Sequence, residues 1–352
     1  MRKLLIINKS TFGHLTDSYM WCKYLKDKFD ITFIGFDALH TRVGMDGVNI
    51  KYISCRGSRA IREYRFLLKS LWHCLLFKGP ILIVYFDKAI WLKKLVFWKK
   101  IFLDIRTFGV NRDPERRKIF DRSLLSTIHG FDRVTIISEG LQEKLNHIGV
   151  KSMILPLGAE EISLVDTNFD ELRLLYVGIL SGRSLEKTII GVKDFKKKYP
   201  NNKITYEIIG DGHYGELEEL KQLTHELALD DCITFHGRLP HTQLEHFFDK
   251  CNIGISFVPK TDYYEFQPPT KTFEYILSGL YTIATSTHAN TELINSDNGR
   301  LINDTSEDFT ASLESIWKNR TSIDHDKIRA SLKSYKWDHI VNDILYPILS
   351  KY

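Results

Sequence analysis

The sequence predicts an α/β protein with two doubly wound domains, each a parallel sheet covered by helices on both faces. Short, nearly continuous apolar segments alternate with helical patterns along the whole chain, which is typical of parallel strands. A polar segment at residues 158–171 interrupts this alternation near the middle. The length of 352 residues, with 43% hydrophobic and 26% charged residues, is suited to about two globular domains.

The apolar segments define the expected strands in chain order. In the first half these are 4–8, 31–36, 48–54, 81–86, 101–106, 134–138 and 153–158. In the second half they are 172–178, 204–210, 232–237, 253–259 and 281–286. We place the domains at 1–165 and 166–335, followed by a closing helical segment at 336–352. Ligands of such sheets bind beyond the carboxyl ends of the strands, so the loops there are the places to look for a site.

Several classes of protein are disfavoured by the sequence. No run of 18 apolar residues predicts a membrane-spanning helix. The N-terminal apolar run is too short for a signal peptide, and no small-residue cleavage site follows it. The five cysteines are odd in number and include no CxxC pair, which indicates a reducing cytoplasm and gives no metal signature.

The net charge of +5 is unevenly distributed along the chain. Residues 1–160 hold 28 lysines and arginines against 15 aspartates and glutamates, a net of +13, which leaves −8 for the remainder. Within residues 51–100 there are 12 basic residues and only Glu63 and Asp87 as acids. The first half therefore favours an anionic partner.

Two predicted helices carry much of this positive charge. Residues 58–79 place on one helical face the basic residues Arg59, Arg62, Arg65 and Lys69. Roughly opposite lie the apolar residues Ile61, Tyr64, Leu68, Leu71 and Leu75. The next segment, 88–100, interleaves tryptophans with lysines. We expect peripheral binding to an anionic lipid surface. The alternative is a pair of helices that cover the sheet with solvated basic faces, and no nucleic-acid-binding module is recognised.

The stretch FQPPTKTFEYILSG predicts a helix that begins at Thr270, after two prolines, and ends at Gly279. Lys271 falls in the first turn, where the helix dipole disfavours a cation. With Glu274 it would otherwise form a solvated pair worth only ~0.2–0.5 kcal/mol. A phosphate bound at the helix N-terminus would remove the penalty, and Glu274 could accept hydrogen bonds from a ribose one turn away.

Two glycine-containing loops follow neighbouring strands of the second domain. In residues 176–191, Gly182 permits close backbone approach, and Arg183 and Lys187 supply positive charge. In residues 208–214, Gly210 and Gly212 form a similar loop. Neither loop has the G-x-G-x-x-G or P-loop spacing, and a simple turn is the alternative interpretation of each.

Taken in order, these motifs resemble a known family. The second half reads YVG…R…K, IIGDG, FHGRLP, PPTKTFEY and TELI with NGRLI, and the first half contains FDRVTIISEGLQEKL and ILPLGAE. With the closing YKWDHIVNDIL, the set resembles the retaining family 4 glycosyltransferases (glycosyl transferases group 1) over nearly the whole chain. The resemblance implies a GT-B fold, two Rossmann-like domains facing across a cleft. The first would bind the acceptor, the second a nucleotide sugar, and the closing helix would cross back to the first.

The same resemblance suggests roles for residues of the second domain. Arg183 and Lys187, or Lys271, would hold the donor diphosphate, Glu274 would bind the ribose, and the loop at Arg238 would flank the base. Thr270, the first residue of the predicted helix, is also a candidate substrate-binding residue.

Members of this family usually carry two glutamates separated by seven residues. The position eight before Glu274 is Phe266, with Glu265 and Gln267 on either side, so either neighbour could take the role of the missing glutamate.

In the first domain, two segments are candidates. The resemblance places the loop after the first strand near the donor phosphates, with Gly13 allowing close approach and His14 facing the cleft, although an incidental histidine is the alternative. Asp104 and Arg106 lie on one face at a strand end, where they would suit sugar or acceptor hydroxyls. A salt-bridged strand terminus is the alternative there.

The resemblance implies transfer of a hexose, with retention, from a UDP- or GDP-linked sugar to a saccharide or lipid-linked saccharide in surface polysaccharide assembly. The basic first half leads us to expect a cytoplasmic enzyme that is peripheral on the inner face of the cell membrane. No cofactor or metal is expected, because fixed cations and helix amides can stabilise a leaving diphosphate. The single D-x-D, Asp324 to Asp326, is interpreted as helix capping. A nucleotide-sugar epimerase and a catalytically silent nucleotide-sugar-binding protein are the alternatives.

Overall fold

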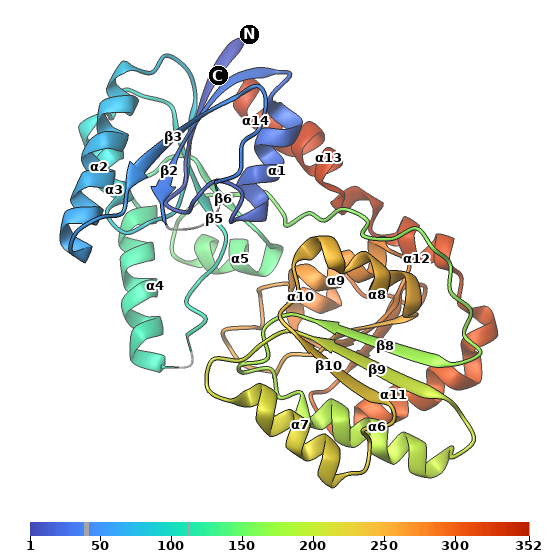
Figure 1. The fold of residues 1–352 in the computed structure, drawn as a ribbon. Helices are drawn as coiled ribbons and strands as arrows, with labels where there is room; N and C mark the ends of the chain where they lie inside the picture. The colour runs from blue at the N-terminus through green and yellow to red at the C-terminus, as the bar shows by residue number, and fades with distance from the viewer. Residues whose placement is uncertain (39–41, 112, 352) are drawn as a thin grey trace. The chain divides into compact units, whose positions relative to one another are not determined.

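The computed structural model describes residues 1–38, 42–111 and 113–351, which form two compact units. Unit 1 comprises residues 1–158 and 337–352, and unit 2 comprises residues 159–336 (Figure 1). The sequence placed the first boundary after residue 165 instead of 158. The polar connection belongs to unit 2, because Ala159 forms a β-bridge with Lys336 and Glu161 forms an ion pair with the same lysine.

Unit 1 is built on a seven-stranded sheet in the order β3-β2-β1-β4-β5-β6-β7, and all of its strand pairs are parallel. The strands are β1 (Arg2–Ile7), β2 (Phe29–Asp37), β3 (Val48–Ser54), β4 (Ile81–Val84), β5 (Ile101–Ile105), β6 (Val134–Ile136) and β7 (Met153–Ile154). The connecting helices are α1 (Thr16–Leu25), α2 (Arg59–Leu76), α3 (Ala89–Leu95), α4 (Pro114–Ile128) and α5 (Glu139–His147).

The closing segment of the chain belongs to unit 1 and packs against α1. It consists of α13 (Trp337–His339), a π-helical segment (Ile340–Leu345) and α14 (Tyr346–Ser350). Trp337 is buried over Gly158, where a Cβ atom would lie 2.7 Å from the indole ring. Lys28 lies over the ring of Tyr346, 4.4 Å from its centre. A glycine and an aromatic residue far apart in sequence thus anchor the end of the chain to unit 1.

Unit 2 is built on a six-stranded parallel sheet in the order β10-β9-β8-β11-β12-β13. The strands are β8 (Leu172–Val177), β9 (Ile204–Ile209), β10 (Ile233–Gly237), β11 (Ile253–Ser256), β12 (Tyr281–Thr285) and β13 (Gly299–Ile302). The helices are α6 (Glu186–Lys198), α7 (Glu216–Glu226), α8 (Glu245–Lys250), α9 (Thr270–Leu277), α10 (His288–Thr291), α11 (Ser306–Asn319) and α12 (His325–Ser331). Short 3-10 helices occupy His241–Gln243, Arg320–Ser322 and Lys333–Tyr335.

Every apolar segment expected to be a strand forms one, and the prediction of two doubly wound sheets is confirmed. The segment predicted at 48–54 coincides with β3. The sequence missed β13, because its four residues include the exposed Arg300 and Leu301 and lack an apolar run. This edge strand follows the loop after α10 and extends the second sheet.

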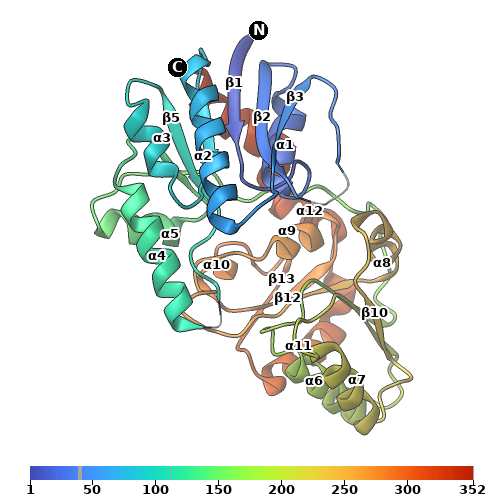
Figure 2. The same cartoon turned by 60° about the vertical axis from the view of Figure 1, so that its left-hand side comes forward.

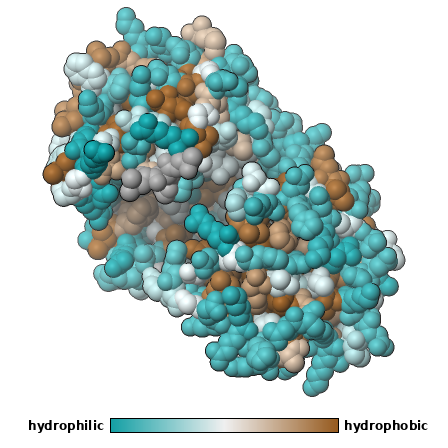
Figure 3. All heavy atoms as spheres, in the orientation of Figure 1, coloured by the Kyte–Doolittle hydropathy of each residue, from teal (hydrophilic) through white to brown (hydrophobic). Residues whose placement is uncertain are grey.

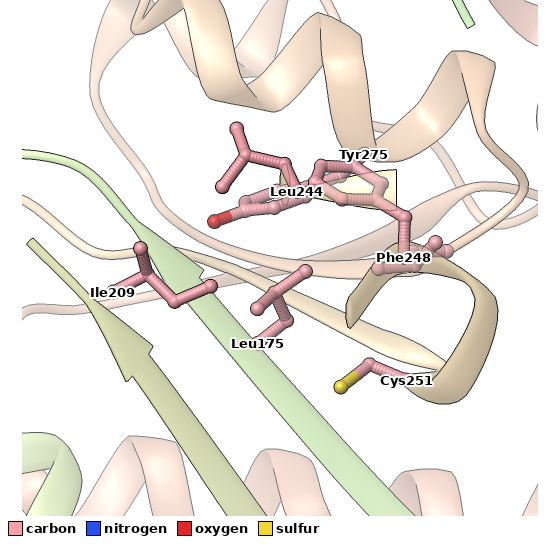
Figure 4. Packing of buried hydrophobic residues seen from close by; sticks show 7 residues of the cluster. Leu175, Ile209, Leu244, Phe248, Cys251 and Tyr275 are labelled. Carbon is pink, nitrogen blue, oxygen red and sulfur yellow. The ribbon is translucent and has the colours of Figure 1, made fainter. Parts of the chain in front are cut away.

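The interior of unit 2 explains how α9 is held beneath the strand ends. Tyr275 is fully buried, and its hydroxyl oxygen accepts a hydrogen bond of 2.7 Å from the Val177 amide. A Cβ atom at Gly254 on β11 would lie 2.3 Å from the Tyr275 ring, so the glycine makes room for it. Figure 4 shows Tyr275 among the apolar side chains of its cluster, which include Leu175 and Phe248. Helix α9 is therefore fixed against the sheet.

Helix α2 corrects one expectation. In the alternative to membrane binding, this helix covers the sheet, so the apolar residues opposite its basic side were expected to be buried. The structure instead buries Phe66, Ser70 and Cys74, while Ile61 and Leu68 are exposed. Figure 3 shows a face of the molecule on which hydrophilic residues predominate and hydrophobic residues form separate patches. Within the described ranges, no helix has both the length and the apolar composition that crossing a membrane requires.

Candidate functional site

The loops at the carboxyl ends of β8, β9 and β10 surround a pocket of about 500 Å³ in unit 2. Its lining residues are Val177, Gly178, Ile179, Ile209, Gly210, Asp211, Gly212, His213, Arg238 and Leu239. The pocket therefore brings together three of the predicted site residues, Gly210, Gly212 and Arg238. Its position matches the rule that doubly wound sheets bind ligands beyond their strand ends.

Close backbone contacts shape this pocket. The Gly178 amide donates to the Ile209 carbonyl, and the Gly210 amide donates to the Gly237 carbonyl. Gly210 has a φ of +156°, and a Cβ atom there would lie 1.8 Å from the Gly178 carbonyl oxygen. No side chain fits between these two loops, so glycine is required at position 210.

The first turn of α9 holds a buried cation beside this pocket. Lys271 is only 9% exposed, and its ammonium lies 3.5 Å from the centre of the Tyr176 ring. A Cβ atom at Gly178 would lie 3.7 Å from the same nitrogen. Lys271 forms no hydrogen bond or salt bridge with any part of the chain that the structure describes. Desolvation lowers its pKa well below the usual value, and the positive charge of Arg183 lowers it further.

Arg183 is the second cation of this site. It follows Gly182, which adopts a φ of +73°, in the loop after β8. Its guanidinium lies 4.6 Å from the centre of the Tyr264 ring. Burial raises the pKa of Tyr176 and lowers that of Lys271, and the positive charge of Arg183 opposes the first shift and adds to the second, so its charge acts on the start of α9. The Glu274 carboxylate opposes this effect on the pKa of Lys271, and an anion bound near both cations would oppose it further.

Lys187, predicted to share this task, is engaged elsewhere in unit 2. Its ammonium donates a 2.7 Å hydrogen bond to the Asp304 carbonyl and lies 3.8 Å from the Asp304 carboxylate. Asp304 stands in the loop after β13, the strand that the sequence missed. The structure thus brings Arg183, and not Lys187, to Lys271.

Glu274 lies one turn after Lys271 and is partly buried. Burial raises the pKa of its carboxyl group, opposed by the charges of His241 and Lys271. His241 opens the short helix after β10 and was not identified from the sequence. The signal that could have found it is the histidine directly after RLP, at the end of a strand that borders the pocket. Thr270, the first residue of α9, is exposed.

The two neighbours of Phe266 both make contacts within unit 2. A Glu265 carboxylate oxygen accepts a 2.9 Å hydrogen bond from the His288 amide at the start of α10. The Gln267 amide nitrogen donates to the Tyr263 carbonyl at 2.6 Å. Glu265 thus holds the first turn of α10, while Gln267 closes its own loop.

In unit 1, Asp104 and Arg106 form a buried ion pair. Asp104 is fully buried, and its two carboxylate oxygens accept hydrogen bonds of 2.6 and 2.8 Å from Arg106. Thr135 also donates to Asp104, at 2.6 Å. Arg106 reaches Asp17 at 3.1 Å and lies over the ring of Trp21. This geometry matches the alternative interpretation, a salt-bridged strand terminus.

The loop after β1 carries the other candidates of unit 1. Gly13 has a φ of +82°, and a Cβ atom there would lie 3.2 Å from Val43, so the loop passes close to that residue. His14 is exposed, and its amide donates to the Thr11 carbonyl. Both residues lie in a tight turn at a strand end.

The D-x-D segment caps a helix, as the sequence predicted. The Asp324 side chain accepts hydrogen bonds from the amides of Asp326 and Lys327 at the start of α12. Among residues 1–38, 42–111 and 113–351, no group of three or more histidine, cysteine, aspartate or glutamate residues is arranged to hold a metal ion.

Residues 171–319, from β8 to α11, match the family described as glycosyl transferases group 1. All candidate residues of unit 2 lie within the matched segment, so the resemblance expected from the motifs is confirmed there. No curated protein sequence matches the chain.

Solved structures resemble the chain over its whole length. Sucrose-phosphate synthase from Thermosynechococcus elongatus has 14% identity and a TM-score of 0.74, covering 100% of both chains. HepE from Anabaena, in complex with UDP and glucose, has 13% identity and a TM-score of 0.76, covering 99% of this chain and 100% of its own. The lipopolysaccharide outer core galactosyltransferase WaaB has 13% identity and a TM-score of 0.72, with the same coverage. The chain thus has the GT-B fold, as predicted.

Proposed function

We propose that this protein is a retaining glycosyltransferase that moves a hexose from a nucleotide diphosphate sugar to a hydroxyl of a saccharide or lipid-linked saccharide. The observation that carries the proposal is the buried ammonium of Lys271 at the start of α9, which has no hydrogen bond or salt bridge among the described residues and which the charge of Arg183 affects. A diphosphate would satisfy both cations and the free amides of the helix N-terminus. The family match at residues 171–319 supports this assignment.

The donor fits the remaining features of unit 2. We assign the nucleoside to the pocket between the loops of Gly210 and Arg238, and the ribose hydroxyls to Glu274. The donor would carry UDP or GDP. Two similar structures support a test of UDP first, since HepE is in complex with UDP-glucose and a trehalose-6-phosphate protein of E. coli is bound with UDP-2-fluoro glucose.

The chemistry rests on charge stabilisation. The bond between the sugar C1 and the diphosphate oxygen breaks, and a bond from C1 to the acceptor oxygen forms. Negative charge grows on the leaving diphosphate, where Lys271 and Arg183 stabilise it without a metal ion. The acceptor proton passes to the departing phosphate oxygen, so the reaction needs no covalent intermediate on the protein. Front-face attack of this kind retains the anomeric configuration.

The acceptor and location follow from the charge of unit 1. The excess of basic residues in the first half would hold the enzyme on an anionic surface, so we propose a peripheral enzyme of surface polysaccharide assembly on the inner face of the cell membrane. Asp104 and Arg106 support the end of β5 in this account. A direct contact with an acceptor hydroxyl would require Arg106 to leave Asp104.

A thermal-shift panel of UDP- and GDP-sugars tests the donor site. At least one nucleotide sugar should stabilise the wild type, and Arg183→Ala and Glu274→Ala should each weaken that effect by about tenfold or more in affinity. Unchanged affinity in both variants would show that the donor binds elsewhere.

A further inference from the structure

Helix α2 buries only a narrow strip of side chains against the rest of unit 1, and its broader apolar side is exposed. The buried positions are Phe66, Ser70 and Cys74, four residues apart, and two of these three are small. Large apolar side chains, by contrast, remain exposed along the helix at Ile61, Tyr64, Leu68, Trp72, Leu75 and Leu76. Their spacing of three or four residues places most of them in one stripe. An amphipathic helix in this orientation presents to its surroundings the side that normally covers a sheet.

The stripe forms a shallow groove, and the neighbouring segment exposes further apolar side chains. A volume of about 620 Å³ lies along residues 60–72 of α2, bordered by Arg65 and Lys69. Helix α3 packs beside α2 (Figures 1 and 2), and the Lys88 ammonium lies 4.2 Å from the centre of the Tyr64 ring. In α3 and directly after it, further large apolar residues are exposed at Trp91, Leu95, Phe97 and Trp98. We call these exposed residues of both segments the α2–α3 face.

Basic residues predominate around the α2–α3 face, where Lys93 of α3 is paired with Asp132. Exposed basic residues at its margins are Arg59, Lys69, Lys78, Lys94 and Lys100. The two acids within residues 51–100 also have partners. Glu63 is paired with Lys9, and Asp87 accepts hydrogen bonds from Ser123 and Tyr85. An apolar surface with tryptophan and tyrosine, bordered by cations, matches the interfacial zone of an anionic bilayer.

We propose that the α2–α3 face inserts its apolar side chains into the interfacial region of an anionic phospholipid bilayer, with α2 lying in the membrane plane. This deepens the proposed function, because it replaces adsorption by charge alone with insertion of named residues. A second copy of the chain is the rival occupant. Two copies meeting face to face would bring their basic margins together, and that repulsion favours the lipid.

Vesicle flotation tests the proposal with the full-length protein. Wild type should float with vesicles containing phosphatidylglycerol, and part of this binding should persist at 0.5 M salt, where charge attraction is screened. Leu68→Ser combined with Trp72→Ser should lower the partition coefficient about tenfold or more at both salt concentrations. Lys69→Ser combined with Lys94→Ser should lower it about tenfold or more at low salt only. Leu164→Ser, a similarly exposed leucine of unit 2, is the matched control and should bind as wild type does.

Three outcomes would overturn the proposal. The first is an absence of wild-type flotation, and the second is equal flotation of wild type and the Leu68→Ser/Trp72→Ser variant. The third is a wild-type dimer that this variant dissociates, which would assign the face to a second copy. Nucleotide release with a soluble acceptor, measured without vesicles, should be unchanged in the variant. If wild type released no nucleotide in this assay, the proposed reaction would be contradicted. The insertion proposal would then still be decided by the flotation experiment.

Discussion

The ammonium of Lys271 lies 3.5 Å from the centre of the Tyr176 ring and forms no salt bridge within the described part of the chain. An aromatic face offsets only part of the cost of burying a cation, and Arg183 adds repulsion. The free protein therefore keeps a group that burial disfavours, at the first turn of a helix. An anionic ligand would stabilise such an arrangement.

Replacing Lys271 by methionine separates stability from binding. Lys271→Met should raise the free energy of unfolding of the unliganded protein by about 1 kcal/mol or more, since an unpaired buried charge is removed. The same variant should weaken nucleotide-sugar affinity by about tenfold or more. Chemical denaturation and titration calorimetry measure the two effects. Lys197→Met, at an exposed position of α6, should change neither. A destabilised variant with normal affinity would show that Lys271 is structural.

Nucleotide binding should take up a proton at alkaline pH. Burial lowers the pKa of Lys271 in the free protein, and an adjacent diphosphate would raise it. Above the lowered pKa, binding therefore protonates the amine. Calorimetry in two buffers of different ionisation enthalpy should detect this uptake in wild type and not in Lys271→Met. Equal proton exchange in both proteins would contradict the assignment of the diphosphate.

The same shift predicts how stability depends on pH. Between the lowered pKa and the usual value of about 10.4, the unfolded chain binds more protons at Lys271 than the folded protein does. The stability of the free wild type, relative to Lys271→Met, should therefore rise with pH through this window. A constant difference would indicate that the ammonium is well solvated.

Asp104→Asn tests whether the buried pair of unit 1 is structural. The change leaves Arg106 poorly compensated in a buried site, so it should cost about 3 kcal/mol of unfolding free energy. Asp132→Asn, which breaks an exposed pair with Lys93, should cost at most about 1 kcal/mol in urea denaturation. If Asp104→Asn kept its stability but lost activity, the result would support a direct catalytic role for Asp104.

Gly210→Ala tests the backbone contact that shapes the pocket. A Cβ atom there would lie 1.8 Å from the Gly178 carbonyl, so the loops must separate, at a cost of about 2 kcal/mol or more. Nucleotide-sugar affinity should fall with it. Gly237→Ala also has a positive φ but no neighbour within 4 Å of the added atom, so it should cost about 1 kcal/mol. If both variants lost similar amounts of stability and affinity, backbone strain alone would explain the effect of Gly210→Ala.

The sequence predicted most of the fold because buried parallel strands are apolar runs, and Val48–Ser54 was predicted with its observed bounds. The sequence also singled out Lys271, because a lysine in the first turn of a helix conflicts with the dipole, and its role in binding a diphosphate stays a prediction. The sequence patterns did not predict contacts between residues that are far apart in the chain. The pairing of Lys187 with Asp304 spans 117 residues, and Glu265 caps a helix 23 residues ahead.

The orientation of α2 was unpredictable for a different reason. Periodicity identifies an apolar stripe but does not say what covers it. The buried residues Ser70 and Cys74 are small, so the sequence did not indicate that their side of the helix packs on the sheet. The large apolar residues of the stripe indicated a packed side, but they are exposed.

The most direct test of the central claim is nucleotide release from UDP- and GDP-sugars, measured with and without saccharide acceptors. The account predicts release of one nucleotide only when an acceptor is present, together with a glycosylated product. Arg183→Ala and Lys271→Met should lower the rate by about a hundredfold or more. Binding of a nucleotide sugar without release in the presence of any acceptor, or conversion of its sugar without transfer, would contradict the claim that this protein is a glycosyltransferase.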